Sequence, residues 1–250
     1  MPMSEILYSK DGAVASIRFN RPEKKNAITI AMYQALVDAL NDASRDGDIR
    51  TVGIFGGDVF TAGNDIGDFL APGAIGQPED LPVFRLLRAL DSFPKPLLAA
   101  VKGPAIGIGT TMLMHCDAVV AGRSARFAMP FTRLGLVPEA ASSVLFPLIA
   151  GRMRASWLML SGDQFGADDA KEFGLVTKVT DDRDVDGEVA LMCGQLAELP
   201  PNAMRSTKRL LKARFADLVD RALTDETKTF IEALGSDEAR AAFMKFMSRS

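Results

Sequence analysis

Apolar and polar residues alternate at the start of the chain, over residues 6–9 and 14–20, on either side of Asp11-Gly12. This period of two predicts two strands, and Asp-Gly is a favoured pair in tight hairpin turns. Over residues 30–44 the apolar positions instead recur every three or four residues, which predicts an amphipathic helix with one buried face. That face carries Met32, Leu36, Val37 and Leu40.

Four short apolar runs follow, at residues 51–55, 97–101, 118–121 and 175–179. Each has the length of a strand, and helical patterns separate most of them. Continuous apolar runs are typical of parallel strands that are buried on both faces of a sheet. The repetition of strand and helix therefore predicts an α/β domain with a mostly parallel sheet.

After residue 184 the pattern changes, and four stretches read as helices without a strand candidate between them: residues 185–199, 202–214, 218–234 and 237–248. We therefore expect an α/β core over residues 1–190 and a C-terminal helical region over residues 191–250. Apolar side chains dominate one face of the last helices, which predicts that they fold over the core or pack between subunits.

The composition narrows the function classes. The chain has 250 residues, 48% hydrophobic and 24% charged, which is ordinary for a soluble globular protein. A net charge of −3 predicts no broad attraction to nucleic acid or anionic membranes, and a single histidine excludes a multi-histidine metal centre. Cys116 and Cys193 lie far apart, which favours free thiols in a reducing compartment. With neither a signal peptide pattern nor a membrane-length apolar run, we expect a cytoplasmic protein.

Two glycine-containing turns offer backbone amides to a ligand. Residues 60–65 contain Gly63 shortly after a predicted strand, and residues 103–111 form a glycine-rich link between another strand and a helix. The second turn matches neither a dinucleotide fingerprint nor a phosphate loop, but its helix-start amides could stabilise an oxyanion. The alternatives are an ordinary turn capped by Asp65 for the first and close helix–strand packing for the second.

Glu139 is the candidate acid or base. It follows a proline and precedes the apolar run 144–149, so it could face a pocket, or it could stabilise the start of a helix. Lys24 and Lys25 could meet a phosphate or simply lie on the surface. Three other polar or aromatic residues are expected to be structural: His115 as a satisfied helix histidine, Asp117 in a local hydrogen bond, and Trp157 in packing.

Four segments, in this order along the chain, resemble the crotonase (enoyl-CoA hydratase/isomerase) superfamily: RPEKKNAIT, FTAGNDIGDF, VKGPAIGIGTTMLMHCDAVVA and ARFAMPFTRLGLVPEAASS. The resemblance covers nearly the whole chain. It implies a ClpP/crotonase-like spiral of β-β-α units with a helical C-terminal trimerisation region, in a homotrimer or a dimer of trimers. It also implies an acyl coenzyme A thioester as substrate, with no separate cofactor.

The resemblance assigns roles to particular residues. The two amides of the family's oxyanion hole match Asn64 and Ile108, where they would bind the thioester oxygen. Positions near the coenzyme's adenine and pantetheine arm match Lys25, Ala27, Ala62 and Asp65.

The resemblance also bears on the reaction. Hydratases of the family use two glutamates, and their positions match Thr111 and Phe131, neither of which is an acid or base at neutral pH. The chain is more similar to the peroxisomal-type Δ3,Δ2-enoyl-CoA isomerases, whose single catalytic glutamate matches Glu139. This implies an isomerase of fatty acid metabolism that moves one proton from C2 to C4, with Phe131, Leu134, Val144 and Leu145 as candidate acyl-chain contacts. The alternatives are a hydratase or another crotonase reaction, or a non-catalytic acyl-CoA-binding protein.

Overall fold

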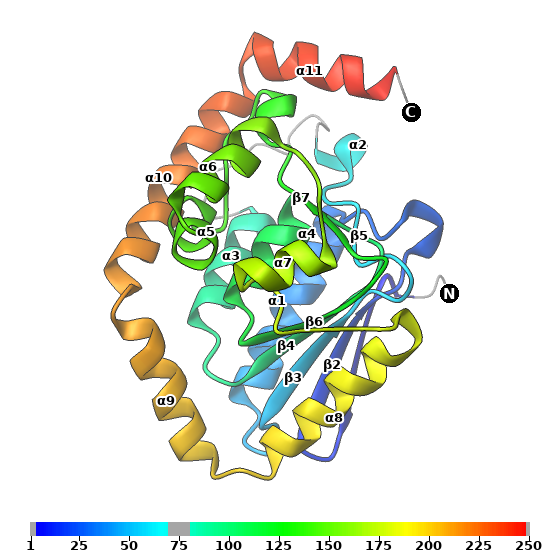
Figure 1. Cartoon of the computed structure of the whole chain (residues 1–250), viewed down its shortest axis with the longest axis vertical. Coiled ribbons are helices and arrows are strands. Elements are labelled where there is room, and N and C mark those ends of the chain that lie inside the picture. Colours follow the sequence, from blue (N-terminus) through cyan, green and yellow to red (C-terminus); the bar gives the residue numbers. More distant parts are fainter. Residues whose placement is uncertain (1–3, 70–80, 249–250) are drawn as a thin grey trace.

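The computed structural model describes residues 4–69 and 81–248, and its centre is a six-stranded sheet (Figure 1). The sheet has the order β1-β2-β3-β4-β6-β9, in which β1 and β2 form an antiparallel hairpin and every later pairing is parallel. The strands are β1 (Ile6–Asp11), β2 (Val14–Phe19), β3 (Thr51–Phe55), β4 (Leu97–Val101), β6 (Ala118–Gly122) and β9 (Lys178–Thr180). The predicted hairpin and the predicted α/β class are confirmed.

Both faces of the central strands β3 and β4 are buried, which explains their continuous apolar runs. In β4, Leu97, Ala99 and Val101 join the main core, which also contains the inner faces of α1 (Ile30–Arg45) and α3 (Pro82–Ser92). The alternate residues Leu98 and Ala100 join a second cluster under α8 (Val185–Ala197), which crosses the opposite face (Figure 1). Successive side chains of a strand point to opposite faces, so a strand between two helical layers is apolar throughout.

A second, three-stranded sheet was not anticipated. It consists of β5 (Pro104–Ile106), β7 (Arg126–Ala128) and β8 (Phe165–Gly166), in the order β5-β7-β8. Strands of two or three residues are too short to show a period of two. After β5 the chain continues through the short helices α4 (Ile108–Thr111) and η3 (Met112–His115).

The C-terminal helices lie outside the sheet, in the order α9 (Pro201–Ala213), α10 (Ala216–Leu234) and α11 (Asp237–Met247) (Figure 1). In the described part of the chain no strand follows residue 184, as predicted. The helix α10 packs against α3 and α5 (Ser142–Ala150), and α11 packs against η4 (Thr132–Leu134). The expected division at residue 190 falls inside α8, which packs on the sheet as one helix; the division itself remains a prediction.

The remaining helices complete the surface. They are η1 (Pro22–Lys24), α2 (Ile66–Phe69), α6 (Arg152–Ser161), α7 (Ala167–Phe173) and η5 (Asp182–Asp184). On α6 the expected packing of Trp157 is wrong, since 65% of this residue is exposed. Met153 and Leu160 are exposed as well and share its side of the helix, four and three residues away. Among the described residues, no helix combines the length and apolarity needed to span a membrane.

Candidate active site

Two segments far apart in sequence run side by side and align the amides of Asn64 and Ile108. The N–H of Thr61 donates to Pro104 O at 3.0 Å and that of Ile106 donates to Thr61 O at 3.0 Å, so Thr61 lies opposite Ala105. Asn64 and Ile108 are each three residues further on and therefore occupy equivalent positions. Within the described residues neither of their N–H groups donates a hydrogen bond, which leaves both free for a ligand oxygen.

Glycine is needed for this close approach. Gly63 has a φ of 91°, and a Cβ atom there would lie 2.9 Å from Ile106 O. A Cβ atom at Gly109 would lie 2.5 Å from Cγ2 of Thr61, so the close packing considered for the second turn is present. Gly107, with a φ of 58°, turns the chain into α4, and Ile108 is the first residue of that helix. Its N–H is unpaired because the first amides of a helix have no intrahelical acceptor.

The carboxyl group of Glu139 lies beside α4. The hydroxyl of Thr111, one turn after Ile108, donates to Oε1 of Glu139, and the glutamate is only 5% exposed. Its Oε2 is buried and has no partner within the described part of the chain. The helix-start alternative is wrong: α5 begins at Ser142, and the Glu139 side chain turns away from its first amides toward Thr111.

The surroundings of Glu139 favour its neutral form. Burial raises the pKa of its carboxyl to about 8, the Thr111 hydrogen bond opposes this rise, and the charge of Glu226 adds to it. Such a pKa places the carboxyl near the range in which one group can both take up and return a proton at neutral pH. The arrangement thus combines one adjustable carboxyl with two unpaired amides.

Tyr33 is a site residue that the sequence pattern did not reveal. It lies on the buried face of α1, and its hydroxyl donates to Oδ1 of Asn64. Burial and the charge of Glu139 raise the pKa of this phenol well above its ordinary value, so it stays protonated. The only sequence signal was a tyrosine on a face predicted to be buried, where a phenol needs a hydrogen-bond partner.

The four residues assigned to the coenzyme lie together. The N–H of Ala62 donates to Lys25 O and that of Asp65 donates to Ile28 O, both at 3.0 Å, which aligns the two segments. Lys25 is exposed, while Ala27, Ala62 and Asp65 are half-buried. The carboxylate of Asp65 forms an ion pair of 2.7 Å with Arg21 and accepts the N–H of Gly67, so here it is engaged within the protein.

Asn26 also holds these segments together, a role that the sequence pattern does not reveal. It is 2% exposed and has a φ of 54°, a conformation that asparagine adopts more readily than most residues. Its Nδ2 donates to Gly56 O at 2.7 Å and to Val59 O at 2.6 Å, while Oδ1 accepts the N–H of Arg21. The signal was an asparagine in a turn just before a predicted helix.

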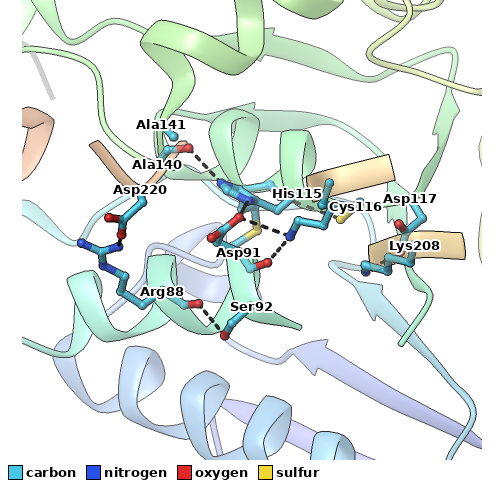
Figure 2. A network of polar contacts seen from close by, with 12 residues as sticks. Arg88, Asp91, Ser92, His115, Cys116, Asp117, Ala140, Ala141, Lys208 and Asp220 are labelled. Atoms are coloured by element: carbon cyan, nitrogen blue, oxygen red, sulfur yellow. Dashed lines mark hydrogen bonds and ion pairs between the residues drawn. The ribbon is translucent and has the colours of Figure 1, made fainter. Parts of the chain in front are cut away.

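His115 has the structural role predicted for it; Asp117 is structural too, but its partners are distant in sequence rather than local. Nε2 of His115 lies 2.8 Å from Ala140 O and its Nδ1 lies 4.0 Å from Asp91. Figure 2 shows His115 between these two residues. Burial lowers the pKa of this histidine to about 4, so the ring is neutral and Nε2 carries the donated hydrogen. Asp117 accepts the N–H of Leu97 and pairs with Lys208 at 2.6 Å.

The cysteines are free thiols, as expected. Burial raises the pKa of Cys116 to about 12 and that of Cys193 to about 11, so neither forms much thiolate at neutral pH. Across residues 4–69 and 81–248, no group of three or more His, Cys, Asp or Glu side chains is arranged to hold a metal ion.

The candidate acyl-chain residues lie on both sides of Glu139 in the sequence, with Phe131 and Leu134 before it and Val144 and Leu145 after it. Phe131 is buried, and Leu134, Val144 and Leu145 are half-buried against the main core. Their contact with an acyl chain remains a prediction.

Known proteins share the sequence pattern and the fold of this chain. The sequence model described as enoyl-CoA hydratase/isomerase matches residues 9–250. The chain belongs to the enoyl-CoA hydratase/isomerase family. It is 38% identical to enoyl-CoA delta isomerase 2 of Rattus norvegicus and 34% identical to the peroxisomal enoyl-CoA delta isomerase 3 of Mus musculus, each over 98% of this chain. These matches cover 63% of the rat protein and 78% of the mouse protein.

Solved structures of this family show the same fold. The enoyl-CoA hydratase/isomerase of Pseudoalteromonas atlantica T6c superposes with a TM-score of 0.93 at 41% identity, over 98% of both chains. OdaA of Pseudomonas aeruginosa also has a TM-score of 0.93 and 41% identity, over 98% of this chain and 99% of its own. The chain therefore has the crotonase fold and lies near the isomerase branch of the superfamily. A probable enoyl-CoA hydratase of Rhodobacter capsulatus is 32% identical, so family membership leaves the reaction open.

Proposed function

We propose that this protein is a Δ3,Δ2-enoyl-CoA isomerase, which converts a 3-enoyl-CoA to the trans-2-enoyl-CoA. The observation that carries the proposal is the buried carboxyl of Glu139, whose Oε2 has no partner in the described part of the chain. It lies next to α4, whose first amide is one of the two free donors. A 1,3-proton shift needs one group that takes and returns a proton and one site for an enolate oxygen.

The reaction follows from these parts. Oε2 of Glu139 takes a proton from C2, and the electron pair of the broken C–H bond delocalises over the thioester and the C3–C4 double bond. The thioester oxygen gains negative charge and accepts hydrogen bonds from the N–H groups of Asn64 and Ile108. Glu139 then returns the proton to C4 and is a carboxylate again, so the double bond has moved to C2–C3 without consuming water.

The raised pKa of Glu139 serves both halves of this cycle. A carboxyl with a pKa of about 8 binds a proton from a weakly acidic carbon far better than an exposed glutamate does. Burial also keeps solvent from the protonated carboxyl, which favours return of the proton to the substrate. Donors to a developing oxyanion contribute about 10²–10³ each in kcat in other enzymes.

Hydration has less support in this site. Of the two positions assigned to the glutamates of hydratases, Thr111 uses its hydroxyl on Glu139 and Phe131 is a buried apolar ring. Glu139 alone would have to activate water and protonate the adjacent carbon. A non-catalytic acyl-CoA-binding protein would have no use for a buried, unpartnered carboxyl oxygen.

The coenzyme would lie along the segments that carry Lys25, Ala27, Ala62 and Asp65. Lys25 is exposed and supplies a positive charge for a phosphate of the coenzyme. Asp65, which is bound to Arg21, would act by holding the segment in shape.

Assembly into a homotrimer or a dimer of trimers is also part of the proposal. The exposed apolar strip of Met153, Trp157 and Leu160 on α6 supports association of copies, because a strip of this kind is rarely left in water. Light scattering of the purified protein measures the mass that decides it.

The decisive assay mixes purified protein with a 3-enoyl-CoA and follows formation of the 2-enoyl isomer. We expect turnover by the native chain and a loss of about 10²–10⁴ in kcat in Glu139→Gln, which keeps the size of the side chain but cannot take up the proton. Full activity of this variant would show that Glu139 is not the base.

Two further measurements separate the alternatives. Substantial addition of water to crotonyl-CoA would favour a hydratase instead. Binding of an acyl-CoA without hydrogen exchange at C2 would favour a binding protein.

A further inference from the structure

The turn that follows Glu139 has an unusual backbone. Ala140 and Ala141 have φ values of 62° and 54°, in the left-handed region that residues with a Cβ atom rarely enter. Two such residues in succession persist only where surrounding contacts hold them. The direction of the Glu139 side chain depends on this turn, because both strained residues follow it directly.

A carboxylate from the C-terminal helical region holds the turn on its amide side. Oε2 of Glu226 accepts the N–H of Ala141 at 2.7 Å, and Oε1 accepts the N–H of Ser143 at 2.9 Å. On the carbonyl side, Nε2 of His115 donates to Ala140 O at 2.8 Å (Figure 2). The two alanines are thus held from opposite sides by residues of α10 and η3.

The carboxylate of Glu226 is buried at a position where a neutral side chain would be easier to accommodate. It is 7% exposed, and within the described residues it forms no ion pair with a lysine or arginine. Burying a carboxylate without a cation costs free energy, and burial accordingly raises the pKa of Glu226 itself. Its two backbone hydrogen bonds offset part of the cost, and its charge acts on Glu139, whose pKa it raises.

We propose that Glu226 is a positioning residue for catalysis, which holds the Ala140–Ala141 turn so that Glu139 faces the substrate. The inference rests on the proposed isomerase reaction for its kinetic consequence. In this proposal the helix α10, which lies outside the α/β core, helps to place the acid–base group Glu139.

Burial shifts the pKa values of other groups near the turn. The pKa of His115 is lowered to about 4 and that of Tyr33 is raised well above its ordinary value, while Glu139 titrates near 8. Among the described residues, the groups that face the turn or its supports are Tyr33 on α1, Asp91 on α3, His115 on η3, Lys208 and Lys212 on α9, and Glu226 on α10. Burial also raises the pKa of Glu226 itself, so the titration of Glu139 has to be followed through the signal of its own carboxyl.

The test compares the native chain with Glu226→Gln. The amide oxygen can accept one of the two N–H groups, but the NH2 group cannot accept the other, and the negative charge is gone. We expect kcat to fall by about ten- to a hundredfold with little change in KM, because a misplaced catalytic group affects the chemical step. The acid limb of the pH profile of kcat/KM is the range in which activity falls because Glu139 becomes protonated. This limb should move to lower pH, because removing a like charge lowers the pKa of Glu139.

Two controls accompany this variant. Glu232→Gln removes the same charge from an exposed position on the same helix and should leave kcat and the pH profile unchanged. An NMR titration of the Glu139 carboxyl, assigned by its loss in Glu139→Gln, follows the same pKa without using turnover. It should also show a lower pKa in Glu226→Gln.

The outcomes separate this inference from the proposed function. Native kcat in Glu226→Gln together with an unchanged Glu139 titration would overturn the inference while leaving the isomerase proposal intact. If the native chain fails to turn over 3-enoyl-CoA, the proposed function falls, and the NMR titration still decides whether Glu226 acts on Glu139.

Discussion

The oxyanion side of the site and its acid–base side are built by different means. Asn64 and Ile108 are aligned by the backbone pairing of Thr61 with Ala105, and Gly63 permits the approach. Glu139 is instead held by contacts among side chains: the Thr111 hydroxyl, 28 residues earlier, and a turn bound by Glu226. Backbone geometry thus sets where charge is stabilised, whereas a few side chains set the pKa and direction of the base.

This difference predicts distinct effects of substitution on the two sides. Changes on the oxyanion side should reduce the rate and leave the pH profile in place, because no titrating group is altered. Changes on the acid–base side should move the profile, because they change the balance between burial, hydrogen bonding and charge at Glu139.

The largest of these effects is expected for Gly63→Ala. The added Cβ would meet Ile106 O at 2.9 Å, and the φ of 91° is unfavourable for alanine, so the two segments must move apart. Misplacing an oxyanion donor predicts a loss of about 10²–10³ in kcat. Steady-state kinetics with a 3-enoyl-CoA between about pH 6 and 9 should show this loss with an unchanged acid limb.

Gly57→Ala is the matched control, because Gly57 has a φ of 71° but no atom lies within 4 Å of the added Cβ. It introduces similar backbone strain without a contact on the site and should keep most of the activity. Native kcat in Gly63→Ala would contradict the role given to this pairing.

A smaller effect is expected for Thr111→Val, which removes the hydroxyl and keeps the shape of the side chain. The Thr111 hydrogen bond lowers the pKa of Glu139, so its loss should raise that pKa and move the acid limb of kcat/KM to higher pH. Because the ionised base is needed, we expect a loss of about tenfold near pH 7 that shrinks as the pH rises.

Thr111→Ser retains the hydroxyl and should restore the native profile. An acid limb that stays in place or moves to lower pH in Thr111→Val would show that this hydrogen bond does not stabilise the carboxylate. The pKa of Glu139 should rise in Thr111→Val and fall in Glu226→Gln, so the two variants test the two contacts by shifts of opposite sign.

The sequence predicted the strands, the helices and the candidate residues more readily than the contacts that surround those residues. The strands at residues 51–55 and 97–101 were predictable because both of their faces are buried and the runs are continuously apolar. Trp157 was assigned wrongly because an apolar patch on a helix looks the same whether it packs inside the chain or is exposed.

The register and the long-range contacts of the site were beyond prediction from the pattern. The glycines showed that amides could be offered, but not that Thr61 lies opposite Ala105, because β5 has only three residues. Glu139 was identifiable as a candidate acid or base. Thr111 and Glu139, which share a hydrogen bond, are 28 residues apart, and Ala141 and the Glu226 carboxylate that accepts its N–H are 85 residues apart. No local periodicity of the sequence encodes such contacts.

The central claim is that one carboxyl carries the proton from C2 to C4. A 3-enoyl-CoA with deuterium at both C2 positions, converted in ordinary water, tests it by the location of deuterium in the 2-enoyl product. Because Glu139 is buried, we predict that a measurable fraction of the product carries deuterium at C4, and that Glu139→Gln abolishes its formation. Product that forms at the native rate with no deuterium at C4 would contradict the account.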